Sequence, residues 1–173
     1  MRFTLCLAVL ASVASMTGCA SAVAIHPFYT SPDLVSDLPL EGTWSGGDQV
    51  WQIQRSDDGY VVTTQNETFN VHLLRLKDSE FVDVASKSDP QIGVAGHLIG
   101  KIAMVEGELY ISPIDETWLK QMVDAGLAPE STMGEGRQIV LTAPTRDLQQ
   151  FILQHVSDPA AWDDDDEGLQ RLH

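Results

Sequence analysis

The chain has 173 residues, with 10 Lys and Arg against 25 Asp and Glu, and a formal net charge of -15. This length suits a single domain. An acidic surface repels nucleic acid and anionic lipid headgroups, so neither is an expected partner of the protein surface. Two cysteines are too few for a scaffold of several disulfides or for a cysteine-rich metal site.

The first residues have the pattern of a cleaved export signal. Arg2 supplies a positive charge, and the 13 residues from Phe3 to Ser15 form an uncharged, apolar segment. A membrane-spanning helix needs about 20 such residues, so this segment is too short to cross a bilayer. We therefore expect residues 1–18 to be removed on export.

The next four residues, Met16-Thr17-Gly18-Cys19, resemble the lipobox of bacterial lipoproteins. In that family the cysteine carries a diacylglycerol, the signal is cut just before it, and the new N-terminus is acylated. The resemblance implies that Cys19 anchors the protein in the cell envelope through lipid, since two or three acyl chains hold a protein stably. Because Ala20 rather than Asp follows, it also implies the periplasmic face of the outer membrane in a Gram-negative host. The alternative is an ordinary secretory signal.

Beyond the anchor, the pattern predicts a short tether and then a series of strands. Residues 19–38 hold several Ser, Pro and Asp without a sustained period, which indicates a lipidated tether. From residue 40, apolar and polar residues alternate in segments spaced by about ten residues, which predicts an up-and-down antiparallel meander. Gly59 is expected to take a positive φ in a tight turn. The adjacent Leu73 and Leu74 break the alternation and suggest a bulge or a twist.

The last third of the chain adds helices. Asp115 is a good N-cap and Gly126 a good stop for one helix, and Pro144-Thr145 opens a second. Residues 163–173 begin with an acidic run and are expected to be a disordered tail. The predicted class is α+β, mainly β, with a single domain over residues 39–162. It would be a curled sheet or partly open barrel of about seven strands, covered or closed by two helices.

Some of these segments resemble a known architecture. Gly42-Thr43-Trp44 is similar to the Gly-x-Trp signature of lipocalin and calycin barrels, in which the Trp packs across the barrel floor. Three further segments resemble an uncharacterised group of bacterial lipoproteins with a lipocalin-like β-domain: Phe81-Val82-Asp83, Trp118-Leu119 and the closing strand and helix from Ile139. This resemblance covers residues 40–162. It implies a fold and a location but no activity.

Residues that could carry chemistry have simpler structural explanations. No pair of histidines has the spacing of metal ligands, and no Gly-x-Ser-x-Gly is present. His72 and His97 fall on predicted strands, where they could meet Asp83. A packed strand histidine is favoured over a mononuclear metal site. We expect no enzymatic activity, no metal and no cofactor.

Apolar residues on the strand faces can either fill a small barrel or line a ligand cavity, and both remain open. The candidate lining residues are Trp44, Trp51, Ile53, Tyr60, Val62, Phe69, Val71, Phe81 and Ile99. We expect a non-catalytic, lipid-anchored envelope protein that binds a small apolar ligand or lipid. The alternative is a structural or interaction lipoprotein with a filled core that binds another envelope protein.

Overall fold

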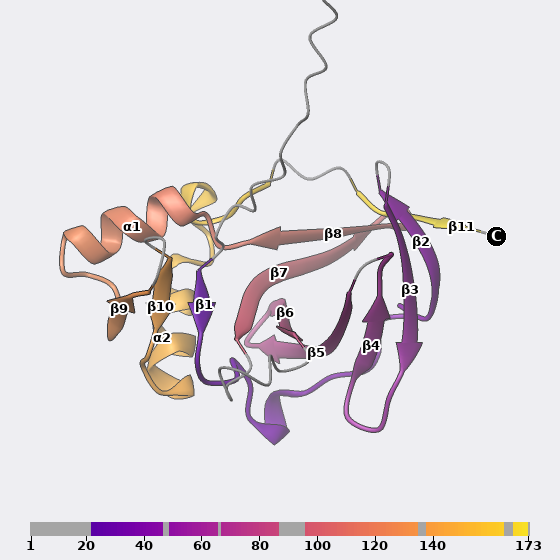
Figure 1. The fold of residues 1–173 in the computed structure, drawn as a ribbon, viewed down its shortest axis with the longest axis horizontal. Coiled ribbons are helices and arrows are strands. Elements are labelled where there is room, and N and C mark those ends of the chain that lie inside the picture. Colours follow the sequence, from indigo (N-terminus) through magenta and orange to yellow (C-terminus); the bar gives the residue numbers. More distant parts are fainter. Residues whose placement is uncertain are drawn as a thin grey trace, which may run out of the picture.

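The computed structural model describes residues 22–46, 49–65, 67–86, 96–134, 138–164 and 168–172, so the signal segment and Cys19 lie outside the described residues. Within these ranges the chain forms a mixed sheet of 11 strands and two α-helices. The expected class, α+β with mainly β structure, is confirmed, whereas the expected number of about seven strands is too low. Figure 1 shows both helices beside the curled sheet.

The middle of the chain is the predicted up-and-down meander. Each strand from β2 to β8 pairs antiparallel with the next. These strands are β2 (Gly42–Gly46), β3 (Gln49–Arg55), β4 (Tyr60–Thr63), β5 (Thr68–Leu76), β6 (Ser79–Ser86), β7 (His97–Val105) and β8 (Glu108–Pro113). The meander curls so that one face of its strands is turned inward (Figure 1).

Gly59 is needed for a reason other than the expected positive φ. It is not one of the residues with a positive φ, but a Cβ at this position would lie 2.4 Å from the carbonyl oxygen of Val71 on β5. The turn between β3 and β4 therefore requires a residue without a side chain because the backbones approach closely. In the turn between β7 and β8, by contrast, Glu106 and Gly107 do have positive φ, at 54° and 91°.

The strand β5 is buried on both faces, and this explains its adjacent leucines without a bulge. Its pairing with β6 continues one to one, with Leu73 opposite Val82 and Leu74 opposite Phe81. Leu73 belongs to a hydrophobic cluster inside the curl, and Leu74 to a second cluster on the outer face. The expected bulge is thus wrong, because a strand between two cores needs apolar residues at successive positions.

Four short strands extend the meander. β1 (Val23–Ala24) runs parallel to β10 (Ile139–Leu141) and pairs with β7 through Ala24 and His97, while β9 (Ser131–Met133) pairs with β10. The parallel pair makes the sheet mixed. The prediction of a tether over residues 19–38 is therefore wrong from residue 22 onward, since Ala24 and Phe28 are completely buried.

The fourth short strand, β11 (Gln170–Leu172), pairs antiparallel with β2 near the C-terminus. Just before it, Leu169 forms an isolated bridge with Leu109 of β8, through two backbone hydrogen bonds of 2.9 and 2.8 Å. The sheet is not closed, because β8 and the segment leading into β11 share this one bridge rather than a ladder. The expected disordered tail and the domain boundary at residue 162 are thus wrong for residues 168–172.

The two helices follow the predicted signals. α1 (Glu116–Asp124) begins after Asp115, whose side chain accepts a 2.6 Å hydrogen bond from the backbone N–H of Trp118. α2 (Thr145–His155) begins directly after Pro144. Both helices pack on the outer cluster, against Phe28 and the outer face of β5 to β7. They do not cover the open side of the curl, contrary to expectation.

Candidate functional site

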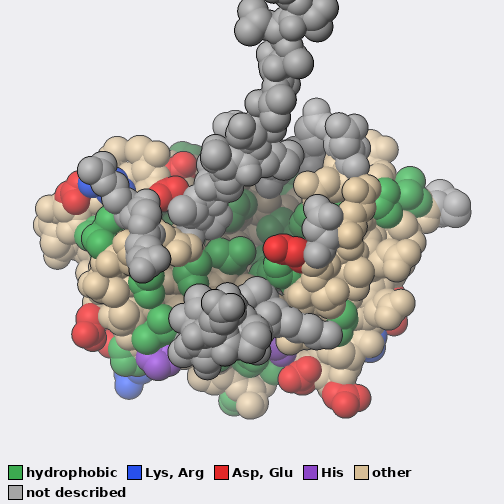
Figure 2. Space-filling model, viewed as in Figure 1, with side chains coloured by type: hydrophobic (Ala, Val, Ile, Leu, Met, Phe, Trp, Pro, Cys, Tyr) green, Lys and Arg blue, Asp and Glu red, His purple; other side chains and the backbone are tan. Residues whose placement is uncertain are grey.

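A cavity of about 460 Å³ lies inside the curl, between β3 and β8. Side chains alternate along each strand, so every second residue of β3, β4, β5 and β8 faces this space. Trp51 and Ile53 of β3 and Leu109 and Ile111 of β8 are examples. Figure 2 shows hydrophobic side chains gathered where this face of the molecule is hollowed at its centre.

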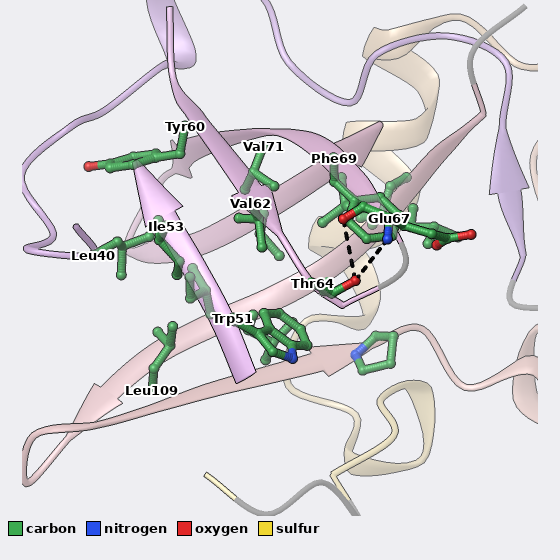
Figure 3. Close-up of a pocket in the computed structure, with 18 of the residues that line it drawn as sticks. Leu40, Trp51, Ile53, Tyr60, Val62, Thr64, Glu67, Phe69, Val71 and Leu109 are labelled. Atoms are coloured by element: carbon green, nitrogen blue, oxygen red, sulfur yellow. Dashed lines mark hydrogen bonds between the residues drawn. The ribbon is translucent and has the colours of Figure 1, made fainter. Parts of the chain in front are cut away.

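The buried end of the cavity is apolar. Leu40, Tyr60 and Leu109 meet there, and each is 2% exposed or less. The Tyr60 hydroxyl points away from the cavity and donates to the carbonyl oxygen of Leu38 at 3.1 Å (Figure 3). Beneath this floor, the Trp44 indole N–H donates to the carbonyl oxygen of Leu40 at 2.8 Å. A ligand at this end therefore meets carbon atoms.

The opposite end of the cavity is partly exposed and carries polar side chains. Trp51 and Phe69 are half-buried there, beside Gln49, Thr64 and Glu67. Thr64 and Glu67 fix the turn between β4 and β5, since the Glu67 backbone N–H donates to Thr64 Oγ1 at 3.2 Å (Figure 3). The cavity thus has an apolar interior and a polar rim, the arrangement expected for a molecule with an apolar body and one polar end.

The structure brings most of the predicted lining residues together around this cavity: Trp51, Ile53, Tyr60, Val62, Phe69 and Val71. Ile99 borders the cavity, but it pairs with Asp83 and its side chain belongs to the outer cluster. Two predicted residues do not line it. Trp44 lies beneath the floor, and Phe81 faces outward, where its ring meets that of Phe28 with centroids 5.6 Å apart. The prediction for Phe81 is wrong because its neighbours Val82 and Val84, which it did not include, hold the inward register of β6.

A second group of polar residues lies on the outer face of the sheet. Asp83 is completely buried, and its two carboxylate oxygens accept hydrogen bonds of 2.7 Å from the backbone N–H of Phe28 and from His97 Nδ1. A buried carboxylate requires such partners, because it has lost its hydration. Asp83 therefore fastens the segment around Phe28 onto β6 and β7.

His72 stands opposite Asp83 in the pairing of β5 with β6. Its ring stacks on that of Tyr29 with centroids 4.4 Å apart, and its Nε2 lies 3.3 Å from the Tyr29 hydroxyl. Burial, followed by the charges of Asp83 and Asp58, raises the pKa of Tyr29. Within the described ranges, no group of three or more His, Cys, Asp or Glu residues is arranged to hold a metal ion. These hydrogen bonds and the ring contact instead hold the N-terminal segment against the sheet.

Comparison of the chain with protein-family models, with curated proteins and with solved structures finds no match. In the part of the chain that the structure describes, no helix has the length and apolar character needed to cross a bilayer. Cys19 lies outside the described residues. The candidate site is therefore defined by the geometry and chemistry of the cavity alone.

Proposed function

We propose that this protein is a lipid-anchored envelope lipoprotein that binds a small apolar ligand or lipid in the cavity and catalyses no reaction. The observation that carries the ligand-binding part is the apolar cavity of about 460 Å³ inside a small β-domain. Protein interiors are normally packed about as densely as organic crystals, so a barrel filled by its own side chains would leave no apolar space of this size between its strands. Its volume lies within the range of ligand sites, roughly 300–1,000 Å³.

The energetics of the cavity favour an apolar occupant. Its walls are mainly aliphatic and aromatic, and a ligand that covers them removes apolar surface from water on both sides of the contact. Each Å² of apolar surface removed from water contributes about 25 cal/mol. The rim residue Gln49 can hydrogen-bond a polar end that stays near solvent, so the site suits an amphiphile as well as a hydrocarbon.

We also propose that the curled meander is a partly open barrel of the lipocalin type. Trp44 supports this description because it lies under the buried end of the cavity, 1% exposed, where the Trp of the Gly-x-Trp signature is expected. Arg171 of β11 adds to this end of the barrel, with its guanidinium 5.2 Å from the centre of the Trp44 ring.

Ligand uptake is tested on a chain that begins at Ala20, which contains every described residue and both hydrophobic clusters. Native mass spectrometry should show a co-purified lipid or stoichiometric uptake of an apolar fluorescent probe. Val84→Trp places a large ring in the cavity wall and should abolish uptake. The matched change Val105→Trp, at a residue that is 52% exposed and outside the lining, should not. A protein that takes up no probe would contradict the proposal.

The anchor is the second part of the proposal, and it is supported by the sequence around Cys19. Expression of the full chain with an alkyne-labelled fatty acid should label the protein and place it in the membrane fraction. Cys19→Ser should remove the label and release the protein. Cys6→Ser changes the other cysteine, inside the predicted signal, and should alter neither. A Cys19→Ser variant that is still labelled would refute lipidation at this residue.

A further inference from the structure

We infer that the cavity selects amphiphiles with a neutral or cationic polar end and discriminates against anionic ones such as fatty-acid carboxylates. This inference rests on the proposed ligand-binding function and names the class of ligand. It follows from the charges at the rim of the cavity and from the places where the cations of the surrounding strands are held.

Glu67 is the one charged side chain among the described residues that line the cavity. It lies at the partly exposed end, beside Phe69 and far from Tyr60 and Leu40 (Figure 3). Its backbone is held by hydrogen bonds with Thr64, so the residue keeps its place at the rim. Figure 2 shows an acidic side chain at the edge of the hollow, next to hydrophobic ones. A ligand whose apolar part enters the cavity keeps its polar end at this rim, where Glu67 is exposed and can turn its carboxylate toward the ligand.

The strands around the cavity also carry Lys and Arg residues, but none of these side chains is part of the described cavity lining. In the described parts of β3 to β8 the Lys and Arg residues are Arg55, Arg75 and Lys101. Arg75 binds Asp37 at 2.7 Å and Glu80 at 2.5 Å. Lys101 lies on the outer face of β7, with its Nζ 4.7 Å from the centre of the Trp162 ring.

Arg55, the third cation, lies outside the buried end of the cavity. Its guanidinium is 5.0 Å from the centre of the Tyr60 ring, and it donates to the Tyr60 hydroxyl at 3.1 Å and to the carbonyl oxygen of Ser36 at 3.2 Å. No side chain of the described lining is therefore positioned to neutralise an anionic ligand. Sites that recognise carboxylate or phosphate usually provide an Arg or Lys for this purpose.

A further polar rim residue fits the same class of ligand. The Gln49 amide can donate and accept hydrogen bonds, so it can bind an alcohol, an amide or an ammonium group. The net charge of -15 also favours a cation over an anion as the ligand. The test must therefore separate the effect of the Glu67 carboxylate on ligand affinity from the effect of the net charge of the protein.

Three ligands with one dodecyl chain measure the charge preference: dodecanol, dodecyltrimethylammonium and dodecanoate, each used below its micelle concentration at about pH 8. The chain beginning at Ala20 is loaded with a fluorescent apolar probe, and each ligand is titrated to displace it. Two like charges about 4 Å apart in water repel by an amount equivalent to a factor of about five in affinity. Dodecanoate should therefore bind more weakly than dodecanol, by up to about fivefold, and dodecyltrimethylammonium at least as tightly as dodecanol.

Glu67→Gln should reduce the difference between dodecanoate and dodecanol without changing the affinity for dodecanol. Glu106→Gln removes the same charge from the exposed turn between β7 and β8, outside the lining, and should leave the difference intact. Equal binding of the three ligands, or an unchanged preference in Glu67→Gln, would overturn this inference while leaving ligand binding established. A protein that binds none of the three would instead refute the proposed function.

Discussion

Leu169 gives the sharpest test of the fold, because the sequence places it in an expected disordered tail and the structure places it in a core. It is 9% exposed and belongs to the cluster inside the curl. Its backbone forms the bridge that joins β8 to the segment leading into β11. If the tail were disordered, the substitution Leu169→Ala would have no effect on stability.

The structure predicts a measurable loss. Leu→Ala substitutions in cores cost about 2–5 kcal/mol, and the position of Leu169 at the edge of the core favours the lower end, about 2–3 kcal/mol. In a domain of this size each kcal/mol lowers the melting temperature by about 2–4 °C, so we expect a decrease of about 4–12 °C. Thermal and urea unfolding, followed by tryptophan fluorescence, measures both quantities.

Leu172→Ala is the matched control, because Leu172 lies on β11 but is 48% exposed. It should change the free energy of unfolding by less than about 0.5 kcal/mol. A Leu169→Ala variant as stable as this control would refute the placement of residues 168–172.

Gly46 on β2 supplies a second, independent check through a double-mutant cycle. A Cβ at Gly46 would lie 2.4 Å from Leu169 Cδ2, so Gly46→Ala should destabilise the wild-type chain by displacing that side chain. In the Leu169→Ala background the Leu169 side chain no longer occupies the space of a Cβ at Gly46. Ala in a strand is then favoured over Gly by about 0.5–1 kcal/mol. The effect of Gly46→Ala should therefore change sign, and additive effects would show that the two residues do not touch.

Three further predictions concern hydrogen bonds. Asp83→Ala leaves a backbone N–H and the His97 imidazole unpaired in the interior, and we expect urea unfolding to show a loss of at least about 2 kcal/mol; a loss below about 0.5 kcal/mol would contradict the buried contact. Asp115→Ala removes the N-cap of α1 and should cost about 1 kcal/mol, whereas Asp115→Asn, which keeps an acceptor, should restore most of it. Desolvation raises the pKa of Asp33, but hydrogen bonds, above all from Thr30, outweigh it and hold that pKa below its ordinary value. The stability from Asp33 is thus present at neutral pH and is lost as the pH falls through the folded-state pKa. Wild type should therefore lose more stability than Asp33→Asn in acid unfolding titrations, and equal losses would argue against this.

Elements that depend on local chemistry could be predicted from the sequence. Asp115 caps α1 through its own side chain, Gly126 ends the helix with a φ of 69°, and the meander follows from alternation and regular spacing. β1 and β11 could not be predicted in this way. They are two or three residues long, too short to show a period, and they form because their backbones meet β10 and β2, which are distant in the sequence.

The same distinction applies to the candidate site. In strands with clear alternation, the sequence alone places residues such as Trp51 and Ile53 on the cavity side. Alternation alone misplaces Phe81 because β6 has apolar residues on both faces, and the face that turns inward is decided by its pairing with β5 and β7. That the curl encloses a cavity rather than a filled core depends on how far the strands stand apart. Side-chain types do not encode this distance, since both arrangements require the same residues.

The folded domain begins by residue 22, close to Cys19 in the sequence, and this would limit how far the domain could move from a membrane. Ala22 is 7% exposed and Ala24 is completely buried in the sheet. A tether over residues 19–38 could reach tens of Å, roughly 60–70 Å if extended, and would let the domain swing freely. Only three peptide bonds separate Cys19 from Ala22, however, and they span at most about 10 Å. On the proposal that Cys19 carries the lipid, the domain would be held against the headgroups with one side always facing the bilayer, and an amphiphile leaving the membrane would cross little water before reaching the protein.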